Sequence, residues 1–124
     1  MTQPLALVIY EKLLPGSQVV NRLRDLNYRV QTIADAERLV EYAEEAKAML
    51  VLADLESRRN NVCAALARLK EHPATKHLPV IAFSGESAVE LQAAARAAGA
   101  TLVVTEVAIL NHMPQLLEQA LQIE

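Results

Sequence analysis

The chain has 124 residues, which suits a single domain over 1–124, because single domains commonly contain roughly 100–150 residues. Hydrophobic residues make up 52% of the chain and aromatic residues only 3%, so Leu, Val, Ile and Ala must supply the core. The net charge is −3 and no basic cluster exceeds the Arg58–Arg59 pair, which argues against binding to nucleic acid.

The same inventory argues against several other classes of protein. Cys63 is the only cysteine, so an internal disulfide and a cysteine-based metal site are excluded. No apolar run approaches the ~20 residues of a membrane span, and no signal peptide precedes the first apolar run. We therefore expect a cytoplasmic protein without a membrane partner.

In the first half of the chain, short apolar runs alternate with amphipathic stretches. LALVIY at 5–10 predicts a strand covered on both faces. The Pro-Gly-Ser sequence at 15–17 predicts a break before a helix over 18–26, with the serine as its cap. YRVQTI at 28–33 alternates in polarity and predicts a more exposed strand. Asp35 is the expected N-cap of the next helix.

The second half continues the alternation. AMLVLAD at 48–54 is the most apolar run and predicts the central strand. Gly99 is the expected C′ residue of the helix predicted at 88–99. Further strands are expected at 78–85 and 101–104, and helices at 61–72, 88–99 and 113–123.

Five strands that alternate with five helices predict an α/β domain with a doubly wound, mostly parallel sheet. In such sheets, binding and catalytic sites form beyond the carboxyl ends of the strands. Those ends are Tyr10–Glu11, Asp54, Ser84–Gly85 and Thr105–Glu106.

Two segments carry a family resemblance. HPATKHLPVIAFSG at 72–85 and AARAAGATLVV at 94–104 resemble the fourth and fifth strand regions of bacterial response-regulator receiver domains, and the spacing from Glu11 through NRLRDLNY at 21–28 also matches. The resemblance extends over essentially the whole chain. It implies a flavodoxin-like (CheY-like) five-stranded parallel sheet with strand order 2-1-3-4-5 and five helices.

A receiver of this family is phosphorylated on an aspartate at the end of its third strand. An acidic pair after strand one holds Mg²⁺ through oxygen ligands, and the aspartate is the nucleophile. A hydroxyl after strand four and a lysine after strand five hold the transferred phosphoryl group. The resemblance implies that Asp54 is the candidate phosphoacceptor, that Ser84 supplies the hydroxyl and that Glu11 is one member of the acidic pair.

The chain departs from the family pattern at five other positions. Tyr10 stands in place of the first acid, Thr105 in place of the lysine, and Glu106 in place of the proline after it. Arg58 replaces the proline that follows the phosphoacceptor, and Leu102 replaces the aromatic residue of strand five. The resemblance is therefore to a degenerate receiver, or pseudo-receiver.

These departures disfavour a phosphorylated state. A metal site reduced to Glu11 and Asp54 is weakened, so Mg²⁺ is possible but no cofactor is required. The missing lysine removes a cation from an anion of about −1.5 to −2 charges, and Glu106 adds a negative group. Arg58 or Arg59 would be a substitute cation, since guanidinium binds phosphate well.

Three functional hypotheses remain open. The leading one is a non-enzymatic pseudo-receiver of a two-component-type system, which contacts a sensor kinase or downstream protein through its helix 4–strand 5–helix 5 face or forms a homodimer. The alternative is a receiver phosphorylated on Asp54 with Mg²⁺. A distant third is a small-molecule binder on a flavodoxin-like sheet, although the loops contain no Gly-rich phosphate cradle.

Several site residues also have structural interpretations. The Asp54 carboxylate can accept local backbone N–H groups, and Ser84 can satisfy the turn after strand four. The Tyr10 hydroxyl would hydrogen-bond Asp54 and fill the space of a metal. The apolar residues at 109–113 are expected to pack beneath the last helix, and Cys63 to pack as a small hydrophobic residue.

Overall fold

The structure, a computed structural model, describes residues 4–10, 13–33, 35–56 and 61–122. Five parallel strands form one sheet in the order β2-β1-β3-β4-β5, which confirms the predicted flavodoxin-like α/β architecture and strand order. The strands are β1 (Leu5–Ile9), β2 (Arg29–Ile33), β3 (Leu50–Asp54), β4 (Val80–Ser84) and β5 (Leu102–Thr105).

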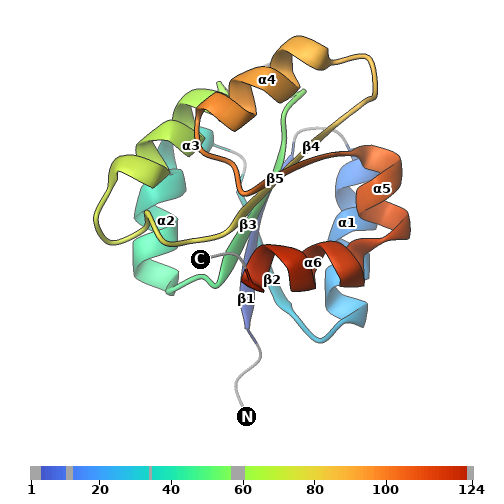
Figure 1. Cartoon of the computed structure of the whole chain (residues 1–124). Helices are drawn as coiled ribbons and strands as arrows, with labels where there is room; N and C mark the ends of the chain where they lie inside the picture. Colours follow the sequence, from blue (N-terminus) through green and yellow to red (C-terminus); the bar gives the residue numbers. More distant parts are fainter. Residues whose placement is uncertain (1–3, 11–12, 34, 57–60, 123–124) are drawn as a thin grey trace.

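Helices cover both faces of the sheet (Figure 1). One face carries α1 (Leu13–Asp25), α5 (Glu106–Asn111) and α6 (Met113–Gln122). The other carries α2 (Leu39–Ala46), α3 (Val62–Glu71) and α4 (Val89–Ala97). Among the described residues, no helix is both long and apolar enough to cross a membrane.

Two apolar cores follow from the alternation of side chains along the strands. In β1, Leu7 and Ile9 face the α2–α4 side, while Ala6 and Val8 face the α1–α6 side. Every residue of β3 is buried, as predicted for the central strand. The edge strand β2 is buried only at Ile33, which explains its alternating sequence.

Helix α1 begins earlier than the sequence suggested. It runs from Leu13 and includes Pro15 and Gly16, so the predicted break at 15–17 and the start of the helix at residue 18 were wrong. Pro15 falls in the first turn, where a backbone N–H has no acceptor within the helix and its loss costs little.

The helix count was also wrong, because α5 and α6 occupy the segment after β5 where one helix was expected. The Thr105 hydroxyl accepts a hydrogen bond from the backbone N–H of Ala108 at 3.1 Å and caps α5. Pro114 would clash with the carbonyl four residues earlier in a continuous helix, so α5 ends at Asn111 and α6 begins at Met113. As expected, Ile109 and Met113 are buried against the sheet.

Two predicted helix boundaries are confirmed. The Asp35 carboxylate accepts a hydrogen bond from the N–H of Glu37 at 3.0 Å and caps a 3₁₀ turn (Ala36–Arg38) that leads into α2. Gly99 follows α4 with a φ of +101°, a conformation that a residue without a side chain adopts without strain.

We expect Gly99→Ala to lower the free energy of unfolding by more than about 1 kcal/mol, measured by urea denaturation. The new Cβ would be strained at this φ and would lie 3.0 Å from Cγ of Lys70, whose Nζ is hydrogen-bonded to the carbonyl of Leu78. Gly85→Ala is the comparison, because its Cβ would meet Glu56 Oε2 at 3.4 Å without that positive φ. Equal losses in the two variants would contradict this account.

Candidate functional site at the carboxyl edge of the sheet

The strand ends singled out in the sequence come together at one edge of the sheet, because all five strands are parallel. Asp54 is the last residue of β3, and Ser84 ends β4 beside Thr105 of β5. Asp54 is 1% exposed and Ser84 is fully buried. The two predicted site residues with the clearest family match therefore lie below the surface of this edge.

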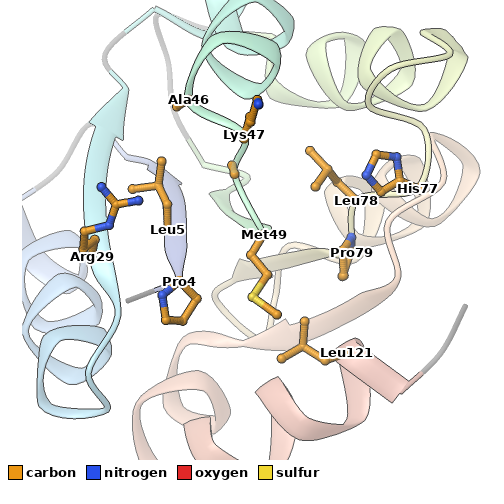
Figure 2. A pocket seen from close by; sticks show the side chains of 11 residues that line it. Pro4, Leu5, Arg29, Ala46, Lys47, Met49, His77, Leu78, Pro79 and Leu121 are labelled. Carbon is orange, nitrogen blue, oxygen red and sulfur yellow. The ribbon is translucent and has the colours of Figure 1, made fainter. Parts of the chain in front are cut away.

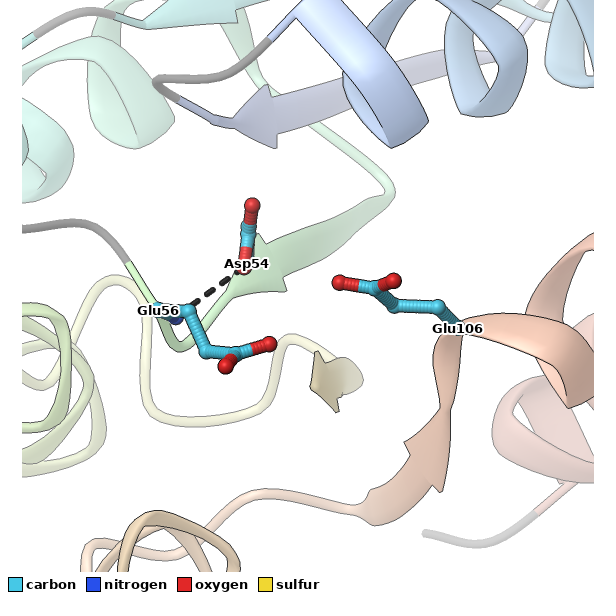
Figure 3. Close-up of side chains that lie close together, drawn as sticks. All are labelled: Asp54, Glu56 and Glu106. Carbon is cyan, nitrogen blue, oxygen red and sulfur yellow. Dashed lines mark hydrogen bonds between the residues drawn. The ribbon is translucent and has the colours of Figure 1, made fainter. Parts of the chain in front are cut away.

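Three carboxylates form an acidic cluster at this edge, made of Asp54, Glu56 and Glu106 (Figure 3). One oxygen from each lies within 4.8 Å of the others. Asp54 comes from the end of β3, Glu56 from the loop after it and Glu106 from the first turn of α5. The side chain of Glu106 points toward Asp54 and Glu56 (Figure 3). Glu56 was missed in the sequence, where its only signal was a second acid two residues after Asp54.

Hydrogen bonds hold two of the three carboxylates in place. Asp54 Oδ1 accepts from the backbone N–H of Glu56 at 3.0 Å, which is the local backbone bond that its structural interpretation predicted. Glu56 Oε2 accepts from the backbone N–H of Gly85 at 2.8 Å. The side chain of Glu56 therefore ties the loop after β3 to the loop after β4.

Ser84 is engaged by the turn that follows it. Its hydroxyl donates to the carbonyl of Gly85 at 3.0 Å, and it accepts from Nε2 of Gln92 at 3.2 Å. Gln92 Nε2 also lies 3.1 Å from the carbonyl of Gly85. The predicted turn role of Ser84 is thus confirmed, and a phosphoryl group would have to compete with these partners for the hydroxyl.

Thr105 has a local role that the sequence did not reveal. Because its hydroxyl caps α5, the position at which the family places its lysine holds a helix N-cap here. The first turn of α5, which this cap stabilises, also carries Glu106, and the Glu106 side chain points toward Asp54 (Figure 3). Leu102, at the position of the family's aromatic residue, is half-buried against the core on the α1–α6 side.

The remaining predicted site residues divide into two groups. Tyr10 is half-buried and packs against the core on the α1–α6 side, while its predicted hydrogen bond to Asp54 stays a prediction. Glu11, Arg58 and Arg59 lie outside the described residues, so the metal-ligand role of Glu11 and the rescuing role of the arginines also stay predictions.

The acidic cluster has the chemistry of a hard-cation site. Carboxylate oxygens are the ligands that Mg²⁺ and Ca²⁺ prefer, and a carboxylate that accepts one backbone hydrogen bond can also bind a cation. Asp54, Glu56 and Glu106 are therefore the described residues that could hold a divalent cation. Of the predicted ligand pair, Asp54 lies among the described residues and belongs to this set.

Cys63 lies in the first turn of α3. Burial raises the pKa of its thiol, which keeps it protonated at neutral pH. Its side chain packs against the core on the α2–α4 side, as predicted for a small hydrophobic residue.

No protein-family model matches the sequence, and no curated protein matches it significantly. Solved structures do match. A protein from Chloroflexus aurantiacus described as a candidate response regulator has a TM-score of 0.87 and 17% identity, with 97% of this chain and 98% of that chain covered. The chain has the fold of a response-regulator receiver domain.

Two further structures extend this receiver likeness. The receiver domain of the sensor histidine kinase PA1611 from Pseudomonas aeruginosa has a TM-score of 0.85 and 18% identity over 97% of this chain and 98% of that one, and it holds a magnesium ion in its active-site cleft. NtrX from Brucella abortus has a TM-score of 0.81 and 22% identity. The match includes 98% of this chain but only 27% of the NtrX chain. At such identities the likeness concerns the receiver fold.

We expect Glu56→Ala to accelerate amide hydrogen exchange at Gly85 by about five- to tenfold, because a bond to a partly exposed carboxylate contributes about 1 kcal/mol. Glu56→Gln should have a smaller effect, since the amide oxygen remains an acceptor. The measurement is residue-resolved exchange by NMR. An unchanged rate at Gly85 in Glu56→Ala would show that the side chain does not join the two loops.

Proposed function

We propose that the chain is an atypical receiver: a cytoplasmic, non-enzymatic module of two-component-type signalling that acts by protein–protein contact and does not depend on aspartyl phosphate. One observation carries this proposal. The Glu106 carboxylate lies beside Asp54, at the edge where a phosphorylatable receiver needs a cation.

The argument is electrostatic. Phosphorylation would place about −1.5 to −2 charges on Asp54, next to two further carboxylates. Two unit charges 4 Å apart interact by about 4 kcal/mol at an effective dielectric constant of ~20. Without a compensating cation, Glu56 and Glu106 would therefore disfavour the acyl phosphate strongly, and Thr105 supplies no such cation.

The groups that would hold a phosphoryl already have other partners. The Ser84 hydroxyl is bonded to Gly85 and Gln92, and the Thr105 hydroxyl caps α5. Recruiting either group would cost a bond within the folded chain. These contacts support a site that holds one conformation without phosphate.

The exposed apolar side chains support a protein partner. Among the described residues, the large exposed hydrophobic side chains include Val89 and Leu91 on α4 and Val107 on α5, which are 65%, 36% and 61% exposed. Between these helices, the edge strand β5 is only half-buried. We place the contact with a sensor kinase, a downstream protein or a second copy of the chain on this α4–β5–α5 face. The predicted face instead combined α4 and β5 with the helix expected at 113–123, which corresponds to α6.

A second candidate function keeps phosphorylation. The acidic cluster offers three carboxylates for Mg²⁺, which would offset the charge repulsion and leave Asp54 as the phosphoacceptor. Bound Mg²⁺ would supply electrophilic stabilisation of a transferring phosphoryl group, with Glu56 and Glu106 helping Asp54 to hold it. The two candidates differ in their dependence on the cation.

The discriminating experiment is an amide NMR titration with Mg²⁺ and then with beryllofluoride, a mimic of the aspartyl phosphate. We expect no saturable beryllofluoride-dependent shift at Asp54, Ser84 or Glu106 at millimolar concentration. Saturable shifts that disappear in Asp54→Asn would refute the proposal and establish the second candidate.

Restoring the missing cation should restore binding. We expect a chain carrying both Thr105→Lys and Glu106→Gln to bind beryllofluoride in the presence of Mg²⁺, because the lysine would neutralise the anion. The matched control carries Thr105→Ala and Glu106→Gln, which loses the same N-cap, worth about 1 kcal/mol, without adding a cation. Equal responses of the two variants would contradict the electrostatic argument.

A further inference from the structure

A pocket lies at the opposite edge of the sheet, where the strands begin (Figure 2). It has a volume of about 650 Å³, within the ~300–1,000 Å³ of small-molecule sites. Its walls come from the starts of β1 and β2, the residues before β3 and β4, the end of α2 and the end of α6. The lining residues used below are Leu5, Arg29, Lys47, Met49, His77, Leu78 and Leu121.

The floor of this amino-edge pocket is apolar. Met49 lies at its centre and extends toward Leu121, with Leu5 and Leu78 on either side (Figure 2). The backbone N–H of Met49 donates to the carbonyl of Leu5 at 2.8 Å. Met49 nevertheless remains 46% exposed, so a flexible thioether that adapts readily to apolar ligands is available here.

The rim of the pocket is basic. Arg29 lies on one side and His77 on the other, and Lys47 follows the end of α2 (Figure 2). Among the described residues that line the pocket, none is acidic. The C-terminus of α2 carries about half a negative charge, which offsets part of the charge of Lys47. Arg29 makes a further interaction within the chain and still contributes a guanidinium group to the rim. The rim therefore complements an anion.

Lys47 also adopts a conformation that glycine normally occupies. Its φ and ψ are 53° and 52°, in the left-handed region that disfavours a side chain. This conformation is common where a helix ends, and Lys47 ends α2 in this way. Here the residue in question carries one of the rim cations.

We propose that the amino-edge pocket binds a small amphiphilic anion, with an apolar body on the Met49 floor and an acidic head group at the Arg29–Lys47–His77 rim. The inference is independent of the proposed function, because the acidic cluster lies at the other edge of the sheet. Octanoate has the required chemistry and serves as the probe, and 1-octanol is its uncharged counterpart.

The test is an amide NMR titration of the full chain with each probe. Octanoate should give saturable shifts at Leu5, Lys47, Met49 and Leu78, with a Kd at least about threefold below that of 1-octanol and weakened by added salt. No saturable shift at millimolar octanoate, or equal affinity for the two probes, would overturn the proposal.

Variants separate the charge of Lys47 from its backbone strain. Lys47→Gly should raise the urea midpoint, because it relieves the strain, yet weaken octanoate about three- to tenfold, as expected for the loss of one exposed charge. Asn27→Gly is the matched control: Asn27 has a φ of 68° but does not line the pocket, so stability should rise with octanoate affinity unchanged. Unaltered octanoate affinity in Lys47→Gly would overturn the role of the basic rim.

Discussion

Three carboxylates meet where the parallel strands end, and the geometry of that edge depends on how they are held. The bond from Gly85 to Glu56 joins the loops after β3 and β4, and the Thr105 cap stabilises the first turn of α5, from which Glu106 points toward Asp54 (Figure 3). The folded chain thus places carboxylates at the edge where a phosphorylatable receiver must accept the negative charge of a phosphoryl group. Because like charges at this separation repel one another, that additional charge would be disfavoured. This constraint connects the local hydrogen bonds to the proposed loss of phosphate dependence.

Much of the fold could be predicted because its determinants are local or periodic. The continuous apolar run of β3 marked the central strand, and the alternation in β2 marked a partly exposed one. The errors arose where tertiary context decides. Pro15 looked like a helix breaker, yet it falls in the first turn of α1, where a missing N–H is tolerated. The division between α5 and α6 depends on the Thr105 cap and Pro114 together, and only the proline had been recognised as a helix signal.

The site was predictable in its positions and less so in its partners. Asp54, Ser84 and Thr105 could be placed at strand ends because parallel strands share one carboxyl edge. Glu56 escaped notice because its role depends on contact with Gly85, 29 residues away in sequence, and no periodicity encodes such a contact. The amino-edge pocket escaped notice for the same reason, since its lining comes from Leu5, Met49 and Leu121, which are distant along the chain.

The central claim is that Asp54 does not take part in phosphoryl transfer, because the negative charges of Glu56 and Glu106 disfavour an acyl phosphate there. It is tested most directly by ³¹P NMR of the chain incubated with acetyl phosphate and Mg²⁺, with a receiver that retains the full set of site residues as the positive control. The account predicts no acyl-phosphate resonance on this chain while the control is phosphorylated. A resonance that appears on the chain and is absent from Asp54→Asn would contradict it.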